Sequence, residues 1–289
     1  MDKETTEIFQ IDRELAEQGV PFHARPSHAA PNILKNKGIS CAFNSPRFRE
    51  ATKKFENVFS GDYRTDNYQA VGLIASCDRV KKIEPCIPFG TVKISSYVAL
   101  GFSSEEEFYF WCRYDDNIVA DAHHAFIDIY SLIEGKEQEN SIASMYRQNS
   151  DNLLTAVVNN LAQSYNISYT NVQLLCLYIE LNLKAALLDV GISENRVRNY
   201  KHNLINLMKR LFKEKKFEKD EMILSDLRKF PKYTDSRYSQ NKHSRLQIIK
   251  LALFSQFVAA SSRRRFYENS YYNQFEKIGL PERSYNLDK

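Results

Sequence analysis

The sequence predicts a mixed fold, in which a small α+β domain over residues 1–140 precedes an all-α antiparallel helical bundle over residues 141–289. Apolar residues recur at helical spacing throughout the second part, whereas the first part also holds short runs rich in Val, Ile, Tyr and Phe. Charge divides the chain at the same place. Up to Asn140 there are 16 Lys and Arg against 22 Asp and Glu, and beyond it 24 against 14. The basic part is therefore expected to bind an anionic partner such as RNA or a nucleotide.

The elements expected in the first part begin with a helix over Thr5–Gln18, which ends at Gly19 and Pro21. A proline-rich connector follows, and Ser45-Pro46 then has the form of an N-cap and first-turn proline for a helix through Phe59. Beyond this helix the spacing indicates a small sheet, with strands at Tyr68–Ser76, Gly90–Phe102, Glu107–Arg113 and Ile118–Ala120. The polar stretch Glu134–Ser141 is the predicted linker.

Every element expected after this linker is helical, because apolar residues recur three and four positions apart. The segment Val172–Val190 is apolar almost all round and ends at Gly191, so we expect it at the centre of a bundle. The predicted helices are Ser150–Ser164, Val172–Val190, Asn203–Lys216, Glu221–Lys229 and Ser244–Ser261.

Composition excludes several classes of protein. With 289 residues, 43% hydrophobic and 26% charged, the chain is long enough for two folded domains and unlike disordered or collagen-like sequences. Five cysteines with no Cys-x-x-Cys pair form neither a disulfide framework nor a zinc module, which favours a reducing cytoplasm. The charged start is unlike a signal peptide, and no stretch reaches the roughly 20 apolar residues that span a membrane. We expect a cytoplasmic protein with no membrane contact.

Two segments of the basic part share one spacing, an Arg followed by five residues and then a His near a helix start. The pairs are Arg196 with His202 and Arg237 with His243. A His can take a proton from a ribose 2′-hydroxyl or give one to a leaving oxygen, and an Arg can stabilise the charge on the phosphate between them. The alternative is structural: each His hydrogen-bonds within the bundle and each Arg forms a salt bridge.

A longer pattern surrounds these pairs. Glu180 and Lys184 stand one turn apart on the apolar helix that ends at Gly191, His202 begins a His-x-Leu-x-x-Leu helix start, and Arg237-Tyr238 follows later. This pattern resembles the HEPN superfamily of helical-bundle proteins, over about residues 141–267. The family often has Pro after the Arg-Tyr pair, where this chain has Ser239.

The resemblance implies two branches of function. Many HEPN members are metal-independent endoribonucleases of the toxin or antiviral type, with an Arg, four to six residues and a His forming a site across a homodimer. Others lack catalysis and bind nucleotides, RNA or partner proteins. The family's catalytic motif usually lies near the start of the last long helix, which favours Arg237 and His243, whereas Val197 replaces the polar residue that often follows the catalytic Arg.

Supporting residues follow from the same pattern. Glu180 and Lys184 can pair with each other, and we expect Glu180 to contact a basic residue such as Arg237 or Arg196, with Tyr238 also in a supporting role. A further set of basic and aromatic residues is suited to contact the RNA backbone and bases: Arg198, Lys201, Arg263, Arg264, Arg265 and Tyr267. For the C-terminal members, from Arg263 onward, the alternative is a helix end exposed to solvent.

Metal and cofactor sites are not expected. His123 and His124 lie between Asp121 and Asp128, but adjacent His side chains point in different directions, so they do not indicate a metal site. Neither a Walker A loop nor a Gly-x-Gly-x-x-Gly motif occurs. Cys176 lies inside the apolar helix and is expected to be packed and inert.

The leading hypothesis is a HEPN-like metal-independent endoribonuclease whose acidic front domain senses, inhibits or recruits a regulatory partner. The second is a non-catalytic HEPN-like module that binds a nucleotide, RNA or protein. The third is an antitoxin-like regulatory subunit whose acidic front domain mimics nucleic acid. Orientation of Arg237 and His243 separates the first two, and clustering of the acidic residues on one face tests the third.

Overall fold

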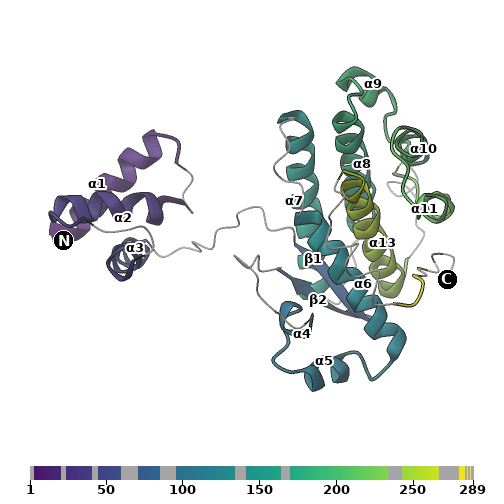
Figure 1. Cartoon of the computed structure of the whole chain (residues 1–289), viewed down its shortest axis with the longest axis horizontal. Helices are drawn as coiled ribbons and strands as arrows, with labels where there is room; N and C mark the ends of the chain where they lie inside the picture. Colours follow the sequence, from purple (N-terminus) through teal and green to yellow (C-terminus); the bar gives the residue numbers. More distant parts are fainter. Residues whose placement is uncertain are drawn as a thin grey trace. The chain divides into compact units, whose positions relative to one another are not determined.

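The computed structural model describes residues 3–20, 24–40, 45–59, 71–84, 96–133, 141–163, 170–233, 243–266, 280–283, 285 and 287. The chain divides into two compact units, Met1–Tyr68 (unit 1) and Gln69–Lys289 (unit 2), which are described separately. Their described parts are mostly helical, with a two-stranded antiparallel sheet in unit 2 (Figure 1). The division lies at residue 68, whereas the sequence analysis placed it near residue 140.

The described part of unit 1 contains three helices, α1 (Lys3–Glu17), α2 (Arg25–Asn36) and α3 (Pro46–Val58). The predicted first helix is confirmed, as is the start of α3, where the Ser45 side chain accepts a hydrogen bond from the Phe48 amide at 3.3 Å. The predicted proline-rich connector is wrong, because α2 forms there. Its apolar residues pack between α1 and α3, which outweighs the helix-breaking tendency of the internal proline; the buried residues of α2 are Pro26, Ala29, Ala30, Ile33 and Leu34.

Unit 2 begins with the hairpin of β1 (Gly72–Ser76) and β2 (Arg79–Ile83), in which Gly72 pairs with Ile83 and Ser76 with Arg79. Every residue of β1 is buried. Position 72 needs a glycine because the Ile129 side chain lies so close to its backbone that a Cβ there would be 2.2 Å from Ile129 Cγ1. The predicted strand at Tyr68–Ser76 is therefore confirmed over its described residues.

The other predicted strands of the first part are wrong where the structure describes them. Short helices α4 (Ser96–Ala99) and α5 (Glu105–Trp111) and the long helix α6 (Asp116–Ile133) occupy this region. Ser104 caps α5, and three glutamates in its first turn suit the positive end of the helix dipole. In α6 the short apolar run at 118–120 is the first turn of a longer stripe with helical spacing, so a window of a few residues misjudged its period.

Beyond residue 140, every helix or strand that the structure describes is a helix, as predicted. These helices lie close to the predicted ranges, except that the first begins nine residues earlier than expected and that α9 forms where no helix was predicted: α7 (Ser141–Gln163), α8 (Thr170–Asp189), α9 (Glu194–Asn199), α10 (Leu204–Glu214), α11 (Asp220–Leu227) and α13 (Arg245–Arg264). Helix α8 packs against α7, α13 and α10, and α11 lies beside α10 (Figure 1). Helix α8 is long and apolar enough to cross a membrane by length and composition, but 72% of it is buried inside unit 2.

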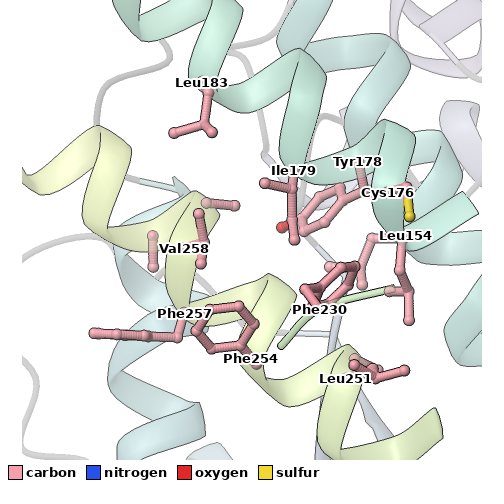
Figure 2. Packing of buried hydrophobic residues seen from close by; sticks show 14 of the residues in the cluster. Leu154, Cys176, Tyr178, Ile179, Leu183, Phe230, Leu251, Phe254, Phe257 and Val258 are labelled. Atoms are coloured by element: carbon pink, nitrogen blue, oxygen red, sulfur yellow. The ribbon is translucent and has the colours of Figure 1, made fainter. Parts of the chain in front are cut away.

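The core of unit 2 lies between α8 and α13. Large side chains of both helices meet there, including Tyr178 and Ile179 from α8 and Phe254 and Phe257 from α13, with Phe230 alongside (Figure 2). All five are at most 5% exposed. Burial of such side chains contributes about 1.5–3 kcal/mol each, so this contact is a main source of the stability of unit 2.

The segments on either side of residue 140 pack together within unit 2. Helix α6 and strand β1 lie against α13, where the Gln256 side chain accepts a hydrogen bond from the Leu73 amide at 2.9 Å and donates one to the Ala125 carbonyl at 3.2 Å. The predicted α+β domain of residues 1–140 is thus divided: its first 68 residues belong to unit 1 and the remainder completes unit 2.

Candidate functional site

A buried carboxylate at the centre of α8 forms the candidate site of unit 2. Glu180 is 4% exposed, and both of its oxygens are used. Oε1 accepts a hydrogen bond from Lys184 Nζ at 2.6 Å, and Oε2 contacts His202 Nδ1 at 2.8 Å. Glu180 does contact basic residues, but they are Lys184 and His202 and not the predicted Arg196, while Arg237 lies outside the described residues. These contacts offset the large cost of burying a charge.

The local chain explains why His202 reaches this carboxylate. It lies in the short turn between α9 and α10, where Lys201 adopts a left-handed conformation with φ of 49°. Asn203 then caps α10, because its side chain accepts a hydrogen bond from the Asn206 amide at 3.0 Å. The turn therefore directs the His202 ring back toward α8, while α10 continues with its apolar residues against the core.

A second contact fixes the plane of the His202 ring. The ring stacks on Tyr233, with centroids 4.6 Å apart and planes 29° apart. The side chain nevertheless remains 50% exposed. A proton on Nδ1, donated to Glu180, leaves Nε2 with a lone pair, and this nitrogen has no partner among the residues that the structure describes. The site thus combines a fixed imidazole, a buried carboxylate and an accessible second nitrogen, which suits proton transfer.

Arg196 and His202 are both placed by the structure. Arg196 lies on α9 with an exposed side chain, and it lines an open pocket with Arg210 from α10. Arg198 is also exposed and pairs with Glu194 at 2.5 Å, and Lys201 is exposed. The three basic residues predicted around His202 are therefore at the surface.

The second Arg–His pair is described only in part. Arg237 and Tyr238 lie outside the described residues. His243 immediately precedes the N-cap of α13, is partly exposed, and lines a small hollow with Lys229, Lys250 and Gln247. Its relation to Arg237 stays a prediction.

The triplet at the end of α13 is in the interior, which corrects its predicted place at a solvated, RNA-binding surface. Arg263, Arg264 and Arg265 are 3%, 5% and 6% exposed. They pair in turn with aspartates of α7, α6 and α11, namely Asp151 at 2.8 Å, Asp128 at 2.6 Å and Asp220. The triplet thereby ties three helices to α13. The aromatic residue predicted to act with it, Tyr267, lies outside the described residues.

Asp128 holds a second arginine that the sequence analysis missed. Arg283 reaches the other carboxylate oxygen at 2.5 Å and lies over the Phe257 ring, 4.5 Å from its centroid. Burial opposes the charge of Arg283, but the Asp128 carboxylate raises the pKa of the guanidinium above its ordinary value. Tyr285 packs on the same ring at 5.9 Å. Asp128 and Arg283 lie 155 residues apart in sequence, and no local pattern indicates such a contact.

The two adjacent histidines of α6 have separate structural roles. His123 contacts the Val119 carbonyl at 2.8 Å and Ser96 Oγ at 3.2 Å, whereas His124 Nε2 contacts the Pro281 carbonyl at 2.8 Å. Burial lowers the pKa of His124, and the neighbouring guanidinium of Arg283 lowers it further. No group of three or more potential metal ligands occurs within the described ranges.

Cys176, on α8 one turn before Glu180, is buried. Its thiol contacts the Pro231 carbonyl at 3.3 Å, and burial raises its pKa to about 12. A thiol held in its neutral form is a poor nucleophile. The expectation that Cys176 is packed in the core is confirmed, and its raised pKa agrees with an unreactive thiol.

The surface next to His202 is basic. Residues 191–219, which form α9, α10 and the adjoining turns, hold nine Lys and Arg against three Asp and Glu. Six of the basic side chains are exposed and form no ion pair with the described acidic residues, and they extend along both helices and their adjoining turns: Arg196, Lys201, Lys209, Lys213, Lys215 and Lys216. Such a surface attracts a polyanion.

Comparison of the chain with known proteins finds no matching family model, no matching curated protein and no matching solved structure.

Proposed function

We propose that unit 2 is a HEPN-like helical bundle that cleaves single-stranded RNA without a metal ion, in the manner of a toxin or antiviral effector. The observation that carries this proposal is the hydrogen bond between His202 Nδ1 and the buried Glu180 carboxylate, which leaves the other ring nitrogen accessible. The basic surface of residues 191–219 beside the imidazole supports an RNA substrate.

In the proposed reaction, His202 Nε2 takes the proton of a ribose 2′-hydroxyl. The 2′-oxygen forms a bond to the adjacent phosphorus, the bond from phosphorus to the 5′-oxygen breaks, and the products are a 2′,3′-cyclic phosphate and a 5′-hydroxyl. Glu180 stabilises the imidazolium that forms, and Arg196 contributes positive charge to the phosphate as its negative charge increases.

A second group must protonate the leaving 5′-oxygen, since His202 has just accepted a proton as the base. We propose that a second copy of the chain supplies it, because a homodimer places two equivalent histidines at one site. His243 of the same chain is the other source of a proton. The two arrangements differ in their dependence on protein concentration.

The test is incubation of the purified protein with single-stranded RNA in the presence of EDTA. We expect cleavage, with cyclic-phosphate ends, and a loss of rate of about 10²–10⁴-fold in His202→Ala. His28→Ala is the matched control, because His28 is an exposed histidine of unit 1. Intact RNA with the wild-type protein, or equal rates for the wild type and His202→Ala, would contradict the proposal. Loss of activity in His243→Ala alone would assign the reaction to the second pair.

A non-catalytic binding module is the second candidate. The 2.6 Å contact with Lys184 favours it, because Lys184 already balances the charge of Glu180 without any help from His202. In that case the His202 contact holds α10 against α8, and the basic surface binds RNA, a nucleotide or an acidic protein. RNA binding without cleavage in the same experiment would support this candidate.

A further inference from the structure

An open pocket lies between α9 and α10, in the basic segment that also carries His202. Its volume is about 340 Å³, and Ile192, Arg196, Asn199, Tyr200 and Arg210 line it. This volume is within the range of small-ligand sites, which is about 300–1,000 Å³. The lining combines two guanidinium groups, one amide, one phenol and one aliphatic side chain.

The guanidinium groups of the pocket have unused donors. Arg210 pairs with Glu214 at 2.5 Å through Nη2, but its Nε is buried and has no hydrogen-bond partner among the described residues. Arg196, on the facing helix, makes no ion pair or hydrogen bond within the described part of the chain. An arginine offers a fork of donors that matches the oxygens of a phosphate.

The remaining lining residues suit a nucleobase. Tyr200 packs against the apolar core of unit 2 and is partly exposed, so its ring is held in place while part of it faces outward. Asn199, at the end of α9, is exposed and carries both a donor and an acceptor. Stacking on an aromatic ring is a common way to bind the bases of single-stranded nucleic acids.

We propose that this pocket binds one nucleotide of a single-stranded RNA, with its phosphate on Arg210 and its base against Tyr200, while Arg196 serves the reacting phosphate. The inference rests on the proposed function, which it extends by assigning a binding site beside the reacting phosphate. Tyr200 and His202 are two residues apart, so their Cα atoms are separated by at most about 7 Å. A nucleotide held in the pocket would therefore place the neighbouring phosphate near the imidazole.

The test measures binding separately from cleavage, with a fluorescent 2′-O-methyl oligonucleotide that has no free 2′-hydroxyl. Fluorescence anisotropy gives its affinity for the wild type and for Arg210→Gln and Tyr200→Leu. We expect each variant to bind about tenfold more weakly. Lys209→Gln is the matched control, since it removes one positive charge from α10 outside the pocket, and we expect a loss of about threefold or less. Melting temperatures identify any variant that fails to fold, and Tyr200→Phe retains the ring if Tyr200→Leu unfolds.

Equal affinities of the wild type, Arg210→Gln and a folded Tyr200 variant would overturn the proposal, as would equal losses in Arg210→Gln and Lys209→Gln. Adenosine 5′-monophosphate is the second probe. If the monophosphate displaces the oligonucleotide only at far higher concentrations, the pocket binds a nucleotide as part of a strand. If both probes bind with equal affinity, the pocket is a site for a free nucleotide. If the variants lose affinity but the wild type cleaves no RNA, the pocket stands and the proposed catalysis fails.

Discussion

Asp128 provides the sharpest test of how unit 2 is held together. It is 1% exposed on α6 and binds Arg264 through Oδ1 at 2.6 Å and Arg283 through Oδ2 at 2.5 Å. Asp128→Asn preserves the size of the side chain and one carbonyl oxygen but removes the charge. Two buried guanidinium groups would then share an amide in place of a carboxylate.

The expected loss follows from the burial of all three groups. Removing one partner of a buried ion pair costs about 3–5 kcal/mol, because the remaining charge stays buried without compensation. For a folded unit of this size, 1 kcal/mol corresponds to a change of about 2–4 °C in melting temperature. We therefore expect Asp128→Asn to lower the melting temperature of unit 2 by about 10 °C.

Circular dichroism during thermal unfolding measures this change. Asp116→Asn is the matched control, because Asp116 is an exposed aspartate in the first turn of the same helix, and we expect a change of at most about 1 kcal/mol. Replacing Arg283 by Met in the Asp128→Asn protein should restore part of the loss, since one uncompensated charge is removed. A melting temperature within about 2 °C of the wild type in Asp128→Asn would refute the reasoning.

Two further predictions concern the same region of unit 2. Burial, and then the charge of Arg283, lowers the pKa of His124 from the ordinary value of 6.5, so the unfolded chain binds more protons than the folded one as the pH falls below that value. Stability should therefore decrease from pH 7.5 to 5.5, by urea unfolding, and decrease less in His124→Gln; equal pH dependence in both proteins would contradict this. Gly72→Ala should destabilise unit 2 by about 1–3 kcal/mol, because the added Cβ would lie 2.2 Å from Ile129 Cγ1 and 2.7 Å from Gln256 Oε1. A thermal melt of Gly72→Ala equal to that of the wild type would show that the contact relaxes without cost.

The helices of the basic part could be predicted from the sequence because their signals are local. Most of them repeat apolar residues at helical spacing, α8 is apolar almost all round, and α10 and α13 have side-chain caps at their first turns. Helix α6 was missed because Ile118 and Val119 near its start favour strands, and only the spacing over its whole length shows the helical period. Packing of this segment against α13 and β1 stabilises the helix over a strand, and a window of a few residues carries no information about such distant contacts.

The candidate site could be predicted in part. The spacing of Glu180 and Lys184 predicts their contact, because residues four apart meet on one helical face. His202 was identified from its spacing to Arg196, but its bond to Glu180 depends on a turn that brings α10 alongside α8. The stacking of Tyr233 and the docking of Arg283 connect segments far apart in sequence, and single positions carry no sign of such contacts.

The pairing of Asp128 with Arg264 and Arg283 has a practical consequence for dissecting the chain. A fragment that begins at residue 141 would lack α6 and β1, leaving two arginines without their shared carboxylate and uncovering an apolar face of α13. Such a fragment should aggregate, although it contains every residue of the proposed catalytic site. Asp128, which lies before position 140, is thus the partner of two arginines from beyond it, and a fragment that begins at residue 69 is the smaller piece to express.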